Sequence, residues 1–512
     1  MTQFYPPESN SFQQVEELLA HETKISAETP TNERLTFYDT FDWRLYENAL
    51  AIIQIGELYS LHNWNRQNTV DQYVLSETPQ FVWDLPPGLL RTTLAPLIGV
   101  RALLPRTTLY RRKSVYRVLN EDEKTVALVT LEIYDAHKEA QAEPLLHVVS
   151  VDAVRGYAKE AEQVCRIFAE AGFRERDAPL VPALLAAASV TPGGYSIKFN
   201  ISLRPDMQAQ AAANLILRSQ LQIMKMNEEY IKQDIDTEFL HDYRVAVRRT
   251  RSALSQIKAV FPEAPTQRFK QDFKFIGALS NQLRDLDVYL LAEEEYKSQL
   301  PEFLQGDIHP LFEYLAEKRA EAQQAVAAGL ESAEYLRIMQ EWELFLEEEA
   351  VEGETAVNAT LPILELAQQR INKHYRRVIK KGRLILKDNR DEHLHSLRIE
   401  CKKLRYLIEF FASLFPPEKI GQIVRQLKQL QNNLGNFNDY TVQETYLLHV
   451  AREMPIRGQT SRDALIAIGC LVGDLHQKRE AVKSEFATTF SSFANKKNEA
   501  LFTELFAPQH KK

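Results

Sequence analysis

Two copies of one basic motif, far apart in this chain of 512 residues, constrain its fold more than any other feature. HDYRVAVRRTR begins at His241, and HSLRIECKKLR begins 154 positions later at His395. Both read His-x2-Arg-x3-basic-basic-x-Arg. LRDLDV from Leu283 and LGNFND from Leu434 match in turn, at a spacing of 151. A repeat of this length holds several helices. It therefore predicts a duplicated helical bundle with pseudo-two-fold symmetry and is too long for a short-unit solenoid.

Each copy of the motif places its basic residues on one face of a helix. At about 100° per residue, the first copy confines its His and Arg side chains to an arc of about 80°, opposite an apolar face. This first arc consists of His241, Arg244, Arg248 and Arg251. The second arc consists of His395, Arg398, Lys402 and Arg405. Arg249 and Lys403 flank the arcs. Either histidine could instead cap a helix or donate one hydrogen bond inside the bundle.

A further basic stripe runs from Lys373 through Arg376 and Lys380 to Arg383. At a repeat spacing of 151, Lys225 and Lys232 correspond to Arg376 and Arg383. Like charges three or four positions apart destabilise a helix by about 0.2–0.5 kcal/mol per pair. A hydrogen bond between a charged group and a phosphate contributes about 1.5–3 kcal/mol and offsets that cost. We therefore expect Lys225, Arg376 and Lys380 to help bind a polyanion, and we interpret Asp285, Asp287 and Asp439 as acids that either start a helix or orient arginines, and not as catalytic carboxylates.

The composition limits where such a ligand can bind. The formal net charge is -8, so any anion must meet locally concentrated basic residues. The three cysteines, Cys165, Cys401 and Cys470, form neither a metal-binding pattern nor a disulfide framework. No apolar run reaches about 18 residues, and the first residues do not read as a secretion signal. We expect a cytoplasmic protein without a metal, a cofactor or a membrane span. Its oligomeric state is left open.

The chain changes character near residue 205. Before it, β-rich runs at Ala49–Ile55, Val126–Tyr134 and Tyr195–Leu203 and a helical pattern at about Asp152–Ala171 predict an α+β domain. After it, apolar residues recur at helical spacing, which predicts an all-α domain. The expected domains are 1–204 and 205–512, and the second divides into halves at about 205–345 and 355–510.

The duplicated motifs, with LRDLDV and LGNFND after them, resemble the CHAD family, the conserved-histidine α-helical domain, over about residues 207–510. The resemblance implies two four-helix bundles around a basic pocket that binds inorganic polyphosphate, and some members collect on polyphosphate granules. By position, the implied ligand-binding residues are the two arcs with Arg249 and Lys403.

The first domain resembles a CYTH domain, the triphosphate-tunnel type, in Tyr38–Leu50, Val100–Arg112 and Lys124–Tyr134. That family carries ExExK on its first strand, where alternate glutamates hold a divalent metal. No ExExK precedes Tyr38, and Ser11–Ala20 reads as a helix. Because triphosphate hydrolysis needs those carboxylates, we expect a tunnel without catalytic residues. Its arginines could still contact an anion or could lie on solvated strand edges: Arg101, Arg106, Arg111 and Arg112.

Three functions remain as hypotheses. The first is a non-enzymatic polyphosphate-binding protein. The second is a metal-dependent CYTH-type triphosphatase that uses the CHAD domain to bind its substrate. The third is a nucleic-acid-binding protein, which the negative net charge and the scarcity of aromatic residues within the basic stripes disfavour.

Overall fold

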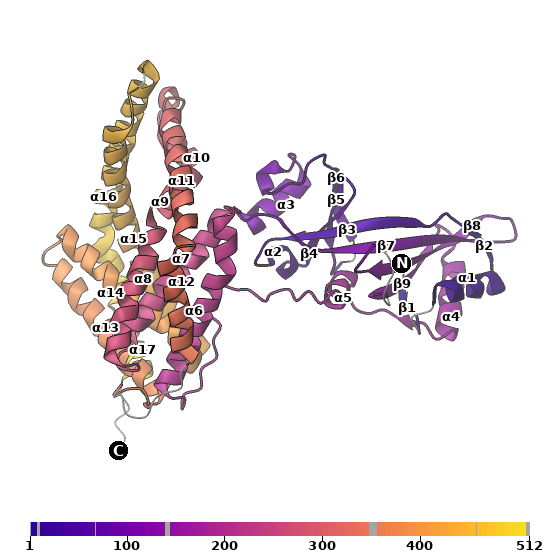
Figure 1. The fold of residues 1–512 in the computed structure, drawn as a ribbon, viewed down its shortest axis with the longest axis horizontal. Coiled ribbons are helices and arrows are strands. Elements are labelled where there is room, and N and C mark those ends of the chain that lie inside the picture. The colour runs from indigo at the N-terminus through magenta and orange to yellow at the C-terminus, as the bar shows by residue number, and fades with distance from the viewer. Residues whose placement is uncertain are drawn as a thin grey trace. The chain divides into compact units, whose positions relative to one another are not determined.

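The computed structural model describes residues 2–7, 11–66, 68–138, 144–347, 356–456 and 458–507. The chain divides into two compact units, Met1–Ser196 and Ile197–Lys512 (Figure 1). The division precedes the expected boundary at 204 because Ile197–Arg204 packs on helices of the second unit. Phe199 lies 5.4 Å from Phe410 between ring centroids, and the Leu203 N–H donates to Ser413 Oγ at 3.1 Å. The strand predicted at Tyr195–Leu203 is therefore wrong. Its apolar residues cover helices instead of joining a sheet.

The first unit is an antiparallel sheet with helices, as the α+β prediction requires. Its strands are β1 Thr2–Tyr5, β2 Lys24–Ala27, β3 Thr31–Asp39, β4 Leu50–Ile55, β5 Leu58–Asn63, β6 Asn68–Val74, β7 Leu104–Leu119, β8 Thr125–Asp135, β9 Leu146–Ala153 and β10 Arg174–Glu175. Its helices are α1 Ser11–Glu22, α2 Arg44–Glu47, α3 Leu89–Ile98, α4 Ala158–Glu170 and α5 Leu180–Ala187, with a 3-10 turn at Val82–Asp84. The described strands are ordered β10-β1-β9-β8-β7-β3-β4-β5-β6, and β2 pairs with β7.

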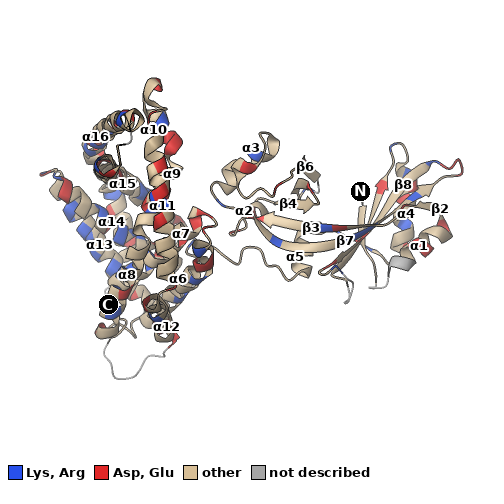
Figure 2. Cartoon of the chain, turned by 45° about the horizontal axis from the view of Figure 1, so that its top comes forward, with Lys and Arg blue, Asp and Glu red and all other residues tan. Residues whose placement is uncertain are grey.

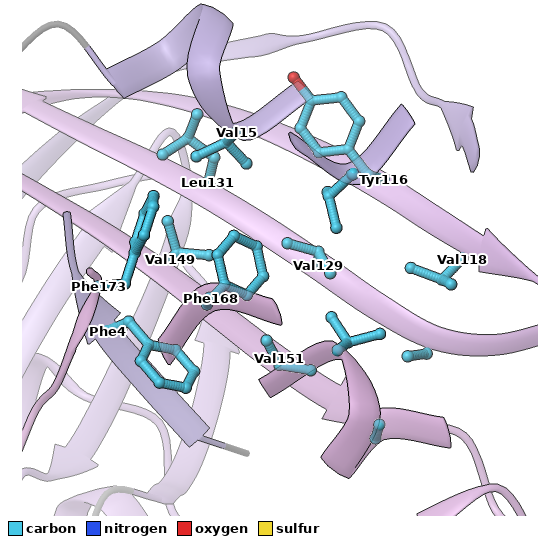
Figure 3. Close-up of a cluster of buried hydrophobic side chains, with 14 of the residues drawn as sticks. Phe4, Val15, Tyr116, Val118, Val129, Leu131, Val149, Val151, Phe168 and Phe173 are labelled. Carbon is cyan, nitrogen blue, oxygen red and sulfur yellow. The ribbon is translucent and has the colours of Figure 1, made fainter. Parts of the chain in front are cut away.

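Alternating apolar residues build a core on each face of this sheet. On one face, Val149 and Val151 of β9 pack under α1 and α4 (Figure 3). On the other face, Val148 packs with Tyr134 of β8 and with α5. Successive strand residues point to opposite faces, so one strand serves both cores. Strands predicted at Ala49–Ile55 and Val126–Tyr134 are confirmed. The helix predicted from Asp152 begins only at Ala158, because β9 runs to Ala153.

The second unit is helical and repeats one order of helices. The first half holds α6 Ala209–Lys232, α7 Thr237–Gln256, α8 Glu263–Leu279, α9 Asn281–Leu291, α10 Glu293–Gln299, α11 His309–Leu330 and α12 Ala333–Glu347, with a 3-10 turn at Glu302–Leu304. The second half holds α13 Ile363–Ile385, α14 Asp391–Phe411, α15 Pro417–Glu453, α16 Gln459–Phe493 and α17 Lys496–Phe506, with a 3-10 turn at Ala412–Leu414. Of the expected limits of the halves, 355 and 510 lie outside the described residues.

The two halves correspond helix by helix. The pairs α6–α7 and α13–α14 pack alike, α8 and α9 together occupy the place of α15, and α11 and α12 match α16 and α17. The all-α prediction is confirmed. Figure 1 shows α11 and α16 as long helices that rise from the body of this unit. Within the described ranges, every helix is too short or too polar to cross a membrane.

Candidate anion-binding site

Helix α7 presents the first basic arc because its other face is buried. The Asp236 side chain caps the helix by accepting from the Glu238 and Phe239 N–H groups at 2.8 and 3.2 Å. Tyr243, Val247 and Leu254 are all buried in the bundle. With that face fixed, His241 and Arg244 are half-buried on the opposite side, and Arg248 and Arg251 are exposed.

Helix α14 presents the second arc by the same packing. Leu397, Cys401, Leu404 and Ile408 are fully buried along its back. Arg398 is partly buried on the front, and His395, Lys402 and Arg405 are exposed there. The helical periodicity in the sequence therefore placed both arcs on the correct side of their helices.

The two arcs meet because α7 packs against α14. Although Lys402 is exposed as a whole residue, desolvation of its amino group, together with the charges of Arg398 and Arg248, lowers its pKa to about 8, while Asp439 opposes that shift. Arg248 belongs to the first half and Arg398 to the second, so cations of both halves act on one ammonium group. Three like charges held this close are a local excess of positive potential within an acidic chain. The arrangement can bind an anion that reaches both halves.

Polar residues in the downstream motifs or just before them hold these cations in place. Arg244 donates from Nη1 to Ser280 Oγ at 2.9 Å and to Asn281 Oδ1 at 3.0 Å. In the second half, Arg398 Nη2 lies 3.2 Å from Asp439 Oδ1, and His395 Nδ1 lies 3.1 Å from Asn438 Oδ1. Burial lowers the pKa of Arg244 to about 10, and the Asp285 carboxylate opposes that shift. Each arc thus has an acid close to its second basic residue.

The aspartates act as the sequence suggested, on arginines. Asp439 contacts Arg398, and Asp285 lies near enough to Arg244 to stabilise its charge. Asp287, which is buried, accepts from Arg319 Nε of α11 at 2.9 Å, so it joins α9 to α11 and does not face the arcs. Tyr289 of α9 and Tyr446 of α15 stack with centroids 4.4 Å apart, which ties the two halves together beside these acids.

A repeat spacing of 154 relates α6–α9 to α13–α15, in place of the mixture of 151 and 154 that the sequence suggested. Asp285 corresponds to Asp439, since each lies near the arginine of its own arc. Upstream, Ala209 corresponds to Ile363, because both open their helices and both are fully buried. The counterpart of Arg284 is then Asn438 and not Gly435. The pairing of Lys225 with Arg376 is wrong by three residues, which is nearly one helical turn.

Three predicted residues lie away from the meeting point of the arcs. Arg249 is 9% exposed and donates from Nη1 to the Ile197 carbonyl at 2.6 Å, so it anchors the start of the second unit. Arg405 donates from Nε to Glu409 at 2.6 Å, and Glu409 also lies 3.9 Å from Arg249. Lys225 contacts Glu343 of α12 at 2.5 Å. Each of these cations already has an acceptor within the protein.

The remaining predicted residues line the flanks of α13 and α14. Lys403 donates to Glu400 Oε1 at 3.1 Å. Arg376 and Lys380 line a groove of about 470 Å³ between α13 and α17, and Lys380 also lines a groove of about 530 Å³ beside α14. Arg251 lies over α8, where a Cβ on Gly277 would come within 3.1 Å of Arg251 Nη1. Arg376 and Lys380 thus belong to the same unit as the arcs but form a separate basic surface, whereas Arg251 lies between α7 and α8.

The arginines of the first unit are engaged by its own residues. Arg111 donates from Nε to Glu33 at 2.9 Å and from Nη1 to Glu132 at 2.7 Å. Arg101 is buried 3.7 Å from Asp42, and Arg106 lies over the Trp43 ring at 4.4 Å. Arg112 lines a surface groove with Arg34 and Asp135. Of these four, Arg101 is neither a solvated edge residue nor accessible to an anion.

A cavity of about 570 Å³ beside the sheet holds the Arg111 ion pairs. Its lining includes Gln3 of the first strand, Glu33, Glu132 and apolar residues of α5. Both glutamates already balance Arg111. Among the described residues, no three His, Cys, Asp or Glu side chains are gathered as a metal ion would require.

Sequence reasoning missed the partners that orient the arcs. Ser280, Asn281 and Asn438 accept or contact the basic residues, but lone Ser and Asn side chains carry no periodic signal. Glu400 is inside the second motif and is buried between His374 and two lysines. Its counterpart at a spacing of 154 is Ala246, so comparison of the two copies could have marked Glu400 as a feature of one half alone.

Comparisons with known proteins match the second unit. The family model described as the CHAD domain matches residues 215–448, which include both arcs. The chain is similar to a solved CHAD domain from the plant Ricinus communis, with 24% identity and a TM-score of 0.49, over 59% of this chain and 98% of that one. It is also similar to PptA from Streptomyces chartreusis, with 15% identity and a TM-score of 0.40, over 56% and 99%. No curated protein matches the chain.

Proposed function

Because residues 215–448 of this chain form a CHAD domain, we propose that the protein binds inorganic polyphosphate without hydrolysing it, across the two basic arcs. The observation that carries this proposal is the packing of α7 against α14, which brings cations of both halves, Arg248 and Arg398, close enough to Lys402 to lower its pKa. Asp439, which contacts Arg398, is the acid that opposes the shift of the Lys402 pKa. A ligand with closely spaced phosphates supplies the missing negative charge.

The physical basis is replacement of counterions. A linear polyphosphate, like a nucleic acid, gathers cations around its charged backbone, and bound Arg and Lys side chains release them. Guanidinium groups donate two hydrogen bonds to one phosphate in a fixed geometry, which favours Arg244, Arg248 and Arg398 as the main contacts. Lys402 adds a point charge between them. His395 and His241 stand one turn from Arg398 and Arg244 and add a donor at the end of each arc.

Alanine at Arg244, Arg248, Arg398 and Lys402 together tests the proposal on the full chain. We expect the folded variant to lose retention on immobilised polyphosphate. The matched control replaces Lys232, Lys297, Lys318 and Lys478, which all form ion pairs with nearby acids. It removes the same charge and should retain binding. Equal retention by both variants would contradict the proposal.

The non-catalytic part of the proposal is supported by the first unit. Glu33 and Glu132 hold Arg111, and Gln3 occupies the first strand where a metal-binding carboxylate would be needed. We expect phosphate release from tripolyphosphate with Mg²⁺ or Mn²⁺ to stay at the level of a control without protein. Turnover well above that level would favour the triphosphatase hypothesis instead.

Competition separates polyphosphate from nucleic acid as the ligand. Tyr289 and Tyr446 stack on each other beside the arcs, so neither ring is free to stack on a base there. Polyphosphate should displace RNA from the purified protein at equal phosphate concentration.

In cells, we expect a cytoplasmic protein that collects on polyphosphate granules, and a fluorescent fusion would locate it.

A further inference from the structure

The outer face of α13 carries a basic groove that the first half of the unit lacks. A groove of about 530 Å³ between α13 and α14 is lined by Arg377, Lys380, Lys381, Arg383 and Lys387, with Leu384 and Glu400. Figure 2 shows the Lys and Arg residues recurring along α13 and α14. Among the described residues, Arg377, Lys380, Arg383 and Lys387 form no ion pair within 4 Å. We call this feature the α13 groove.

The one acid of the α13 groove is already neutralised. Glu400 lies 3.0 Å from His374 Nδ1, 3.1 Å from Lys403 Nζ and 3.6 Å from Lys381 Nζ. Hydrogen bonding from His374, followed by the charges of the two lysines, lowers the pKa of Glu400 to about 2. The carboxylate therefore stays charged but is shared among its own partners. Within the described ranges, the exposed cations Arg377, Lys380, Arg383 and Lys387 have no carboxylate within 4 Å, although Glu499 lines the neighbouring groove with Lys380 and Arg383.

The corresponding surface of the first half is not basic. At a spacing of 154, the groove cations fall opposite Ile223, Met226, Asn227, Glu229 and Gln233. The lysines that α6 does carry are paired, Lys225 with Glu343 and Lys232 with Glu229. Arg218 donates from Nε to the Leu346 carbonyl at 3.0 Å. Since α6 and α13 occupy the same place in the fold, packing does not require the cations of α13.

The α13 groove lies on the other side of α14 from the central arcs. Lys402 belongs to the arcs, and the adjacent Lys403 reaches Glu400 at the edge of the groove. A helix with its side chains is about 10–12 Å across. One helix width thus separates two basic surfaces, and Lys402 and Lys403 lie between them.

We propose, on the premise that the arcs bind polyphosphate, that a long chain continues from the arcs over α14 into the α13 groove. This continuation of the bound chain beyond the arcs lies on the second half only. Chains long enough to reach the groove gain its contacts, and chains that fill only the arcs do not. The asymmetry of the two halves thereby makes affinity depend on chain length.

The test uses the full-length protein with Lys380, Arg383 and Lys387 replaced by alanine, all of which are exposed. We expect affinity for polyphosphate of about one hundred phosphates to fall at least tenfold, and affinity for tripolyphosphate to change less than threefold. For the long chain, the slope of log affinity against log salt concentration should become shallower by about two to three. The charge-conserving variant K380R/R383K/K387R should retain long-chain affinity.

The matched control replaces Lys232, Lys297 and Lys318 of the first half, which form ion pairs with nearby acids, and it should leave both affinities unchanged. An equal loss for both ligands would overturn the inference, because the groove would then act only through general charge. No loss for either ligand would also overturn it. A different result would show that the proposed function itself is wrong. In that case, long-chain binding would persist when Arg244, Arg248, Arg398 and Lys402 are replaced.

Discussion

At the scale of single residues, we expect Lys402 to make the proposed polyphosphate binding depend on pH. Its pKa is lowered to about 8 by desolvation of the amino group and by Arg398 and Arg248, and only the protonated form attracts phosphate. Affinity should weaken as the pH rises through 8, by about tenfold between pH 7 and 9. Binding isotherms across that range check the prediction.

Lys402→Arg is the control for this dependence, since a guanidinium group stays charged at these pH values. The variant should bind with nearly constant affinity from pH 7 to 9. If wild type and variant lose affinity in parallel, the titrating group is not Lys402.

Residue type and spacing predicted much of the site, but contacts decided which cations are available. Arg248 and Arg249 are adjacent in sequence, yet one is exposed beside Lys402 and the other is buried against the Ile197 carbonyl. Helical periodicity separates the two faces. Helical periodicity does not reveal that a segment outside the helix supplies a hydrogen-bond acceptor. That acceptor is a backbone carbonyl, which every residue has, so the pattern of side chains cannot indicate it.

At the scale of elements, close packing of α13 on α16 depends on Gly382. A Cβ at this position would lie 1.9 Å from Phe490 Cε2, and both residues are buried. Gly382→Ala should therefore destabilise the unit by about 1–3 kcal/mol through overpacking, despite the better helix propensity of alanine. Denaturant unfolding measures the change.

Gly435→Ala in α15 is the comparison, because a Cβ there meets nothing within 4 Å. It should be neutral or stabilise the helix by up to about 1 kcal/mol. Equal stabilities for both variants would mean that α16 can move away from α13 without cost.

The elements also show why the spacing of the repeat was misjudged. A shift of three residues is close to one helical turn, so apolar positions match almost equally well in either register. Leu283 can be aligned with Leu434 or with Phe437, and both are buried. The polar contacts of Asp285 and Asp439 decide between the registers. Such contacts join separate helices and cannot be read from one helix at a time.

At the scale of the whole molecule, the helical unit begins at Ile197. A fragment 205–512 would lose the acceptor of buried Arg249 and the contact of Phe199 with Phe410. A charged hydrogen bond and an aromatic contact together contribute about 2–4 kcal/mol. We expect fragment 197–512 to melt about 5 °C higher than fragment 205–512. Thermal unfolding of both checks this, and equal melting temperatures would show that the segment adds nothing.

The whole chain is acidic while its second unit concentrates basic residues on α13 and α14. Acidic residues gather elsewhere in the same unit, as on α10, where Glu293, Glu294 and Glu295 are consecutive (Figure 2). Net charge therefore did not reveal where basic residues gather, and the arcs did. The division of the chain into α+β and all-α parts was predictable from hydrophobic periodicity, because that signal is averaged over many residues.

The most direct test of the central claim is the salt dependence of polyphosphate binding by the full chain and by the variant with alanine at Arg244, Arg248, Arg398 and Lys402. Counterion release predicts that log affinity falls linearly with log salt and that the variant's slope is shallower by about three to four. The variant's affinity for polyphosphate should fall to the level of nonspecific electrostatic binding. Unchanged affinity and slope in a folded variant would contradict the account.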